Sequence, residues 1–184
     1  MTNLYFVRHA QSAYTPDELG RPLTEKGFAD AKKVTEIFKN VEIDVVISSP
    51  YKRAIQTVEG IAHDFGKEME IEEGFKERML SIVPAEDFTF AITKVWEDES
   101  FAWGGGESNE AARKRGSEVT CRILEKYKGK DIVIGTHGNI MVLIMSYFDQ
   151  QYDFSFWRNL EMPDVYKLTF DGRELRSVER LWGG

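Results

Sequence analysis

Two arginines and two histidines occur just after three apolar stretches of this sequence. They are Arg8, His9, Arg53 and His137. A guanidinium group offers forked N–H donors that fit phosphate oxygens, and an imidazole can bind an anion or act as a nucleophile. If the fold brings these four side chains together, they form a pocket for a phosphoryl group.

The apolar stretches that precede these residues are expected to be buried β-strands. Segments 3–7, 43–47 and 131–135 are short and rich in apolar residues, which is typical of strands covered on both faces. Each is followed by a segment expected to be helical, and Thr24 is a plausible N-cap for the first helix. This alternation predicts an α/β protein, a three-layer α/β/α sandwich with a mostly parallel central sheet.

The segment after the second strand is expected to open a helix. Ser48 and Ser49 can cap it, and Pro50 can be its first residue, which places Arg53 in the first turn. A further short strand is expected at 69–73.

The rest of the chain predicts a long helix, an excursion and a terminal hairpin. Segment 108–128 has the length and apolar spacing of a helix. The turn signal Asp171-Gly172 predicts a hairpin that adds an antiparallel strand at one edge of the sheet. Residues 79–107 have mixed polarity and predict a lid-like excursion, within a single domain of residues 1–184.

The position of the four cations in this pattern predicts one anion-binding crevice. Open α/β sheets bind ligands outside the carboxyl ends of their strands, where helix N-termini add unpaired N–H groups. Each cation alone is unremarkable, but together they indicate a phosphoryl site. The third histidine, His63, lies among charged residues and is expected at the surface, and Cys121 is expected to be an inert buried thiol.

The composition argues against several other classes of protein. The net charge of −7 over 184 residues disfavours a general nucleic-acid or membrane-surface binder. No apolar run approaches the roughly 20 residues of a membrane span, and a cytoplasmic protein is the simplest expectation. A two-histidine metal site would lie beside two permanent positive charges, so no metal and no cofactor are expected.

Three segments, in this order, resemble the histidine phosphatase superfamily, which is also called phosphoglycerate mutase-like. The segments are Arg8-His9-Ala10-Gln11-Ser12, the run from Ser48-Ser49-Pro50 through Arg53-Ala54 to Thr57, and Thr136-His137-Gly138. Two spacers, Pro22–Gly27 and Gly106–Ser108, also look like this family. The resemblance extends from residue 4 to about 140, and the combination is specific although an Arg-His pair alone is not.

The resemblance implies a mechanism for the predicted pocket. His9 would attack phosphorus and form a phosphohistidine, while Arg8, Arg53 and His137 would bind the phosphoryl oxygens. Attack needs an unprotonated ring nitrogen, and the two guanidinium groups should lower the pKa of His9 below its usual value of about 6.5. The other ring nitrogen should donate to a backbone carbonyl group, which fixes the tautomer.

The family also implies an acid that protonates the leaving group and then activates water. Glu77, in Phe75-Lys76-Glu77-Arg78, fits the family pattern best, and Glu72 and Glu73 are nearby rivals.

Further substrate contacts are expected from Gly138 and from Thr15, which falls where many members have an asparagine that touches phosphate. Ala10 replaces the usual glycine, a change that is tolerable if the backbone there avoids positive φ. This departure, with Gln11 and Ser12 in place of the common Glu and Thr, leaves the substrate open.

The leading hypothesis is a metal-independent phosphomonoesterase that acts on a small phosphorylated metabolite through a phosphohistidine. One alternative is a cofactor-dependent phosphoglycerate mutase, which the short chain disfavours because only the region around 79–107 can close over a substrate. Another is a non-catalytic protein that binds a phosphorylated ligand on the same fold. The sequence predicts neither the substrate nor the oligomeric state.

Overall fold

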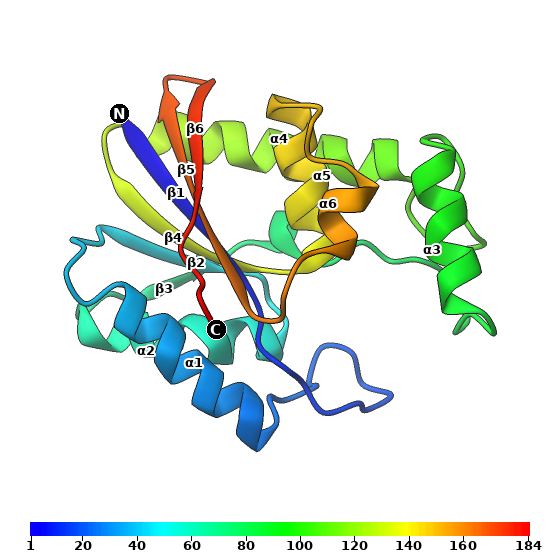
Figure 1. Cartoon of the computed structure of the whole chain (residues 1–184), viewed down its shortest axis with the longest axis horizontal. Coiled ribbons are helices and arrows are strands. Elements are labelled where there is room, and N and C mark those ends of the chain that lie inside the picture. Colours follow the sequence, from blue (N-terminus) through cyan, green and yellow to red (C-terminus); the bar gives the residue numbers. More distant parts are fainter.

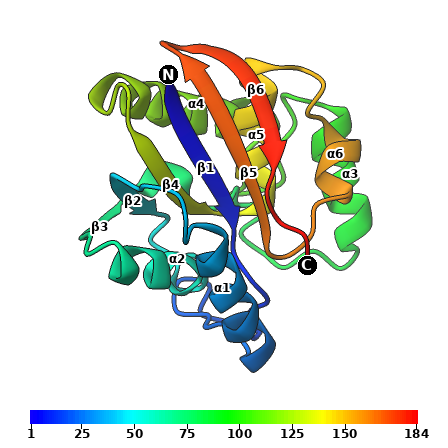
Figure 2. The same ribbon diagram turned by 60° about the vertical axis from the view of Figure 1, so that its left-hand side comes forward.

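The computed structural model describes residues 1–184 and is built on one six-stranded sheet (Figures 1 and 2). The strands are β1 (Thr2–Arg8), β2 (Val45–Ser48), β3 (Met69–Ile71), β4 (Asp131–Thr136), β5 (Asp164–Asp171) and β6 (Glu174–Arg180). Their order is β3-β2-β4-β1-β5-β6, and the first four are parallel. The β5–β6 hairpin joins β1 in antiparallel register, as the Asp171-Gly172 turn predicted.

Helices cover both faces of the sheet, which confirms the predicted α/β/α sandwich (Figure 1). They are α1 (Glu25–Ile37), α2 (Lys52–Asp64), α3 (Phe88–Glu97), α4 (Asn109–Lys126), α5 (Gly138–Phe148) and α6 (Phe154–Arg158), with a 3-10 turn at Glu73–Phe75. Helices α1 and α2 pack on one face, and α4 and α5 pack on the other.

Strand β1 shows how the sequence produces two cores. Its side chains alternate between the faces, because successive residues of a strand point to opposite sides. Leu4 and Phe6 join the apolar cluster under α4 and α5, whereas Tyr5 and Val7 join the cluster under α1 and α2. All four are buried, so the strand is fixed from both sides and the direction of its last residue, Arg8, is fixed with it.

The ends of the predicted helices are mostly confirmed. Thr24 caps α1, with its hydroxyl oxygen accepting from the amide of Gly27 at 3.0 Å. Ser108 caps α4 in the same way. Gly129, with φ of 79°, follows the last turn of α4, where an L side chain would be strained.

The predicted start of α2 was wrong. The helix begins at Lys52 and not at Pro50, and no side chain caps it. The hydroxyl oxygen of Ser49 accepts from the amide of Tyr51 at 3.2 Å and lies 2.8 Å from Nε2 of His137. The hydroxyl group of Ser49 therefore contacts His137 at the ends of the strands instead of capping α2.

Two other predictions need correction. The strand predicted at 69–73 ends at Ile71 and is followed by the 3-10 turn, where Glu72 acts as the cap. Helix α6 was not predicted, because five residues are too few to show a helical period.

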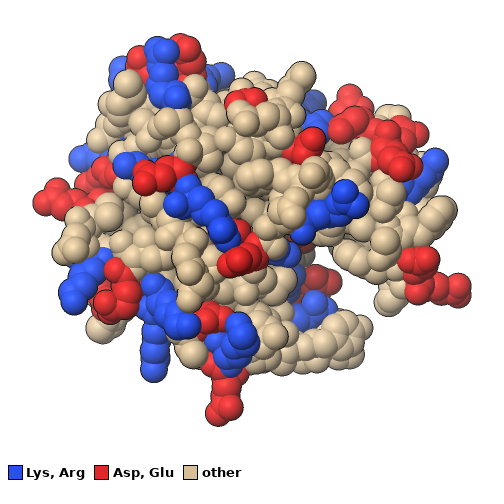
Figure 3. Space-filling view, viewed as in Figure 1, with Lys and Arg blue, Asp and Glu red and all other residues tan.

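The excursion at 79–107 contains one helix, α3. Figure 1 shows α3 standing away from the sheet. Figure 3 shows a hollow on this face between α3 and the loop that follows β1.

Candidate active site

Arg8 is the last residue of β1 and lies between the neighbouring strands β4 and β5, in register with Thr136 and Asp164. Its Nη1 donates to the carbonyl oxygen of Glu161 at 3.1 Å. Its Nε is buried and has no partner. The guanidinium group packs against Gly138, where an added Cβ would lie 2.9 Å from Cζ of Arg8. Arg8 therefore lies beside the Thr136-His137-Gly138 segment, as expected if the ends of these strands share one crevice.

His9 is nearly buried, with 7% of its surface exposed. Its amide donates to the carbonyl oxygen of Thr136 at 3.0 Å, and its Nδ1–H donates to the carbonyl oxygen of Ala10 at 2.7 Å. The predicted tautomer is therefore confirmed, and Nε2 is left without a proton in the neutral ring.

The pKa of His9 is lowered to about 3, as predicted in direction but with a different main cause. Burial lowers it most, because a charged ring loses its hydration. The hydrogen bond to Ala10 opposes this effect, and the charges of Arg53, Arg8 and Arg21 add to it. His9 is thus neutral over the whole physiological pH range.

The alanine at position 10 fits its place. No residue other than glycine has positive φ, so Ala10 meets the condition set for replacing the usual glycine. Its amide donates to the hydroxyl oxygen of Thr57 at 3.0 Å, and that hydroxyl donates to the carbonyl oxygen of Arg53 at 2.7 Å. These bonds tie the end of β1 to the first turns of α2.

Arg53 lies in the first turn of α2, as predicted, and only 3% of it is exposed. Its Nη1 donates to the carbonyl oxygen of Glu18 at 2.8 Å, and its Nη2 donates to Oε1 of the same residue at 3.0 Å. Its guanidinium also lies over the ring of Tyr51, 4.8 Å from the ring centre.

His137 is completely buried at the N-cap of α5. Its ring centre is 5.2 Å from that of His9 and 5.0 Å from that of Tyr51. Its Nε2 lies 2.8 Å from the hydroxyl oxygen of Ser49, and its Nδ1 has no partner. Burial holds the pKa of His137 well below its usual value, and the electrostatic effects of His9, Arg53 and Arg8 lower it further.

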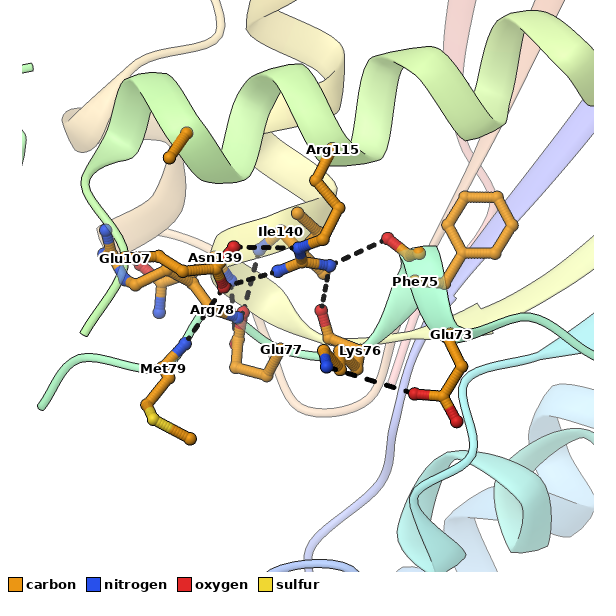
Figure 4. A network of polar contacts seen from close by, with 12 residues as sticks. Glu73, Phe75, Lys76, Glu77, Arg78, Met79, Glu107, Arg115, Asn139 and Ile140 are labelled. Atoms are coloured by element: carbon orange, nitrogen blue, oxygen red, sulfur yellow. Dashed lines mark hydrogen bonds and ion pairs between the residues drawn. The ribbon is translucent and has the colours of Figure 1, made fainter. Parts of the chain in front are cut away.

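Glu77 lies against the first turn of α5, the helix whose N-cap is His137 (Figure 4). Its Oε2 accepts from the amide of Asn139 at 3.0 Å, and its Oε1 accepts from the amide of Ile140 at 2.9 Å. The rivals Glu72 and Glu73 point elsewhere: Glu72 accepts from Gly74, and Glu73 pairs with Lys76. The geometry therefore favours Glu77 over both rivals.

Two arginines that the sequence reasoning missed hold the Glu77 segment in place (Figure 4). Nη1 of Arg115 donates to the carbonyl oxygens of Gly74 and Lys76 at 2.9 and 3.0 Å. Arg78 is buried, and its Nη2 donates to Oδ1 of Asn139 at 3.1 Å. The sequence gives no signal that Arg78 is buried, because it is a single arginine in a charged stretch directly after Glu77.

Thr15 hydrogen-bonds within its own loop. Its hydroxyl donates to the carbonyl oxygen of Asp17 at 3.0 Å, and its carbonyl oxygen accepts from Nη2 of Arg21 at 3.1 Å. A phosphate contact from Thr15 stays a prediction. Arg21, which was also missed, is close enough to His9 for its charge to lower the pKa of that ring.

The predicted positions of His63 at the surface and Cys121 in the interior are confirmed. The side chain of His63 is 90% exposed, and Cys121 is buried. No group of three or more His, Cys, Asp or Glu side chains is arranged to hold a metal ion. None of the helices is both long and apolar enough to cross a membrane.

A sequence model of the histidine phosphatase superfamily (branch 1) matches residues 4–181. The chain therefore belongs to this superfamily, as its motifs predicted.

Curated relatives differ in length and in the activity that they are named for. "Putative phosphoserine phosphatase 2" of Hydrogenobacter thermophilus is 34% identical over 108 residues, which cover 56% of this chain and 53% of the relative. The chain thus spans about half the length of that relative. The "2,3-bisphosphoglycerate-dependent phosphoglycerate mutase" of Methanococcus vannielii is 26% identical, covering 98% of this chain and 94% of the relative.

A solved structure with the same fold is that of a mycobacterial glucosyl-3-phosphoglycerate phosphatase in complex with VO3. It superimposes with a TM-score of 0.81 over 97% of each chain at 18% sequence identity. This likeness confirms the fold.

Proposed function

We propose that the protein is a metal-independent phosphomonoesterase that acts on a small phosphorylated metabolite through a phosphohistidine at His9. The observation that carries the proposal is the state of His9. This ring is neutral, its Nδ1 proton is held by Ala10, and its neighbours include Arg8, Arg53 and His137. A neutral ring with one fixed proton leaves Nε2 as a nucleophile beside groups that bind an anion.

The first half-reaction transfers the phosphoryl group to the protein. Nε2 of His9 attacks phosphorus, the bond between phosphorus and the ester oxygen breaks, and the leaving oxygen takes a proton from Glu77. Arg8, Arg53 and His137 bind the phosphoryl oxygens as charge develops. The buried and unpartnered Nε of Arg8 and Nδ1 of His137 support these roles, because a phosphoryl group gives such atoms something to bind.

The second half-reaction releases inorganic phosphate. The carboxylate of Glu77 takes a proton from a water molecule, whose oxygen attacks phosphorus and displaces Nε2 of His9. Glu77 then carries the proton needed for the next cycle. Its hydrogen bonds to the amides of Asn139 and Ile140 support this role, since they hold the carboxylate in one orientation at the start of α5.

We further propose that residues 79–107 form a lid over the substrate. The segment begins two residues after Glu77 and is fastened to the same network, because the amide of Glu107 donates to the carbonyl oxygen of Met79 at 2.8 Å. The hollow between α3 and the loop after β1 leaves room for a substrate (Figure 3).

The test of the function is hydrolysis of p-nitrophenyl phosphate, with and without EDTA, followed by a panel of phosphorylated metabolites. Phosphoserine and glucosyl-3-phosphoglycerate belong in the panel, because relatives or structural neighbours are named for them. We expect activity that survives EDTA and is abolished by His9→Ala. Activity that needs an added metal, or that persists in His9→Ala, would contradict the proposal.

The mutase alternative has support from the Methanococcus vannielii relative, which is matched over nearly its whole length. It predicts phosphoryl exchange between phosphoglycerates with little release of phosphate. Measuring both products in one reaction separates the two activities.

A further inference from the structure

The loop between β1 and α1 places a carboxylate on a cation of the candidate site. Oε1 of Glu18 accepts from Nη2 of Arg53 at 3.0 Å, and the carbonyl oxygen of Glu18 accepts from Nη1 at 2.8 Å. Both terminal nitrogens of Arg53 are therefore bound by one residue of the same chain. The side chain of Arg53 is 4% exposed, whereas that of Glu18 is 57% exposed.

Arg8 differs from Arg53 in this respect. Its Nη1 donates to a backbone carbonyl group, its Nε has no partner, and no carboxylate forms an ion pair with it. A backbone carbonyl carries no net charge, so an arriving anion displaces no ion from Arg8. At Arg53, an arriving anion meets a carboxylate that is already bound.

The loop is held in place without the Glu18 carboxylate. The amide of Lys52 donates to the carbonyl oxygen of Leu19 at 2.9 Å. The amide of Ala13 donates to the carbonyl oxygen of Pro22 at 2.8 Å. The carbonyl contact of Glu18 with Arg53 would also remain. The carboxylate can therefore leave Arg53 by a side-chain rotation while the loop stays attached.

We propose that Glu18 is a competing anion that occupies Arg53 until a phosphoryl group displaces it, and that returns to Arg53 when inorganic phosphate leaves. This inference rests on the proposed function, because it takes Arg53 as a phosphoryl-binding group. Glu18 thereby weakens the binding of substrate and product alike, and it limits product inhibition. A phosphoryl dianion can displace it because two negative charges interact more strongly with a guanidinium than one does.

The experiment measures binding of inorganic phosphate by calorimetry and its competitive inhibition of p-nitrophenyl phosphate hydrolysis. Glu18→Gln keeps the shape of the side chain but replaces a charged acceptor with a neutral one. We expect phosphate to bind about fivefold more tightly to Glu18→Gln, because a neutral hydrogen bond to Arg53 is weaker than a charged one. KM should fall to a similar extent while kcat does not rise.

Asp17→Asn is the matched control, since Asp17 is an exposed carboxylate of the same loop that forms no ion pair. Asp17→Asn removes one negative charge from the loop but leaves the Glu18 carboxylate bound to Arg53. The phosphate affinity of this variant should therefore stay close to that of the wild type. A second comparison uses Arg53→Gln, in which adding Glu18→Gln should give no further gain.

A gain in affinity cannot come from a damaged site, so the expected result distinguishes competition from a structural role. An unchanged or weakened phosphate affinity in Glu18→Gln, a gain equal to that of Asp17→Asn, or a gain that persists without Arg53 would each overturn the inference. If the wild type hydrolyses phosphomonoesters and binds phosphate, such a result leaves the proposed function intact. A wild type that neither binds phosphate nor hydrolyses phosphomonoesters overturns both.

Discussion

Nδ1 of His9 lies 2.7 Å from the carbonyl oxygen of Ala10, and this contact determines which nitrogen of the ring can react. A carbonyl oxygen only accepts, so the ring proton is on Nδ1 and the free lone pair is on Nε2. Burial among cations keeps this ring neutral. The end of β1 therefore presents an uncharged nucleophile next to a permanent cation, Arg8.

The lowered pKa of His9 and His137 links stability to pH. Each ring is neutral in the folded protein at pH values where it is protonated in the unfolded chain, so the unfolded state binds more protons. The stability that each ring contributes should therefore be fully present above pH ~6.5 and should be lost as the pH falls, by about 1.4 kcal/mol per pH unit for each histidine. For His9 this loss continues down to its folded-state pKa of about 3. Urea unfolding at several pH values between about 4 and 7 measures how steeply the free energy of unfolding changes with pH.

The His9→Asn variant isolates this contribution. Its free energy of unfolding should change less steeply with pH than that of the wild type, by the contribution of one histidine. The control is His63→Asn, which removes an exposed histidine outside the site. Equal slopes in wild type and His9→Asn would show that His9 is not held neutral by the fold.

Gly138→Ala tests the packing of Arg8 against α5. The new Cβ would lie 2.9 Å from both Cζ and Nε of Arg8, so the guanidinium must move. Because a hydrogen bond to a charged group contributes about 1.5–3 kcal/mol, we expect kcat/KM for phosphomonoesters to fall about 10- to 100-fold. Gly183→Ala is the control, since nothing lies within 4 Å of a Cβ there. Full activity in Gly138→Ala would place the phosphoryl group away from Arg8.

Much of the site was predictable because its residues follow strands with a strong apolar signal. Leu4–Val7 and Ile132–Ile134 are buried runs, so the positions of Arg8, His9 and His137 at the strand ends could be read directly. The contact of Arg53 with Glu18 could not be predicted from the sequence, because it joins residues 35 apart that share no periodic pattern. The same holds for Ser49, whose type and position equally suit a helix cap.

Glu77→Gln separates the catalytic and structural roles of this side chain. A glutamine cannot donate the proton, so hydrolysis of alkyl phosphates should slow more than that of aryl phosphates, whose leaving groups need no acid. The variant should also be destabilised by about 1 kcal/mol, because glutamine has one acceptor oxygen where Glu77 has two for the amides of Asn139 and Ile140.

Glu73→Gln provides the control for that experiment, since this exposed carboxylate pairs only with Lys76. It should leave both classes of substrate unaffected. Equal losses for alkyl and aryl phosphates in Glu77→Gln would indicate that another group supplies the proton.

The most direct test of the account is to trap the phosphorylated protein. Rapid acid-free quenching during turnover of a labelled phosphomonoester, followed by peptide mass spectrometry, should locate one acid-labile phosphoryl group on His9. The His9→Ala variant should carry none and should lose activity by about 10³-fold or more. A turning-over enzyme with no phosphohistidine, or with the label on another residue, would contradict the assignment of His9 as the nucleophile.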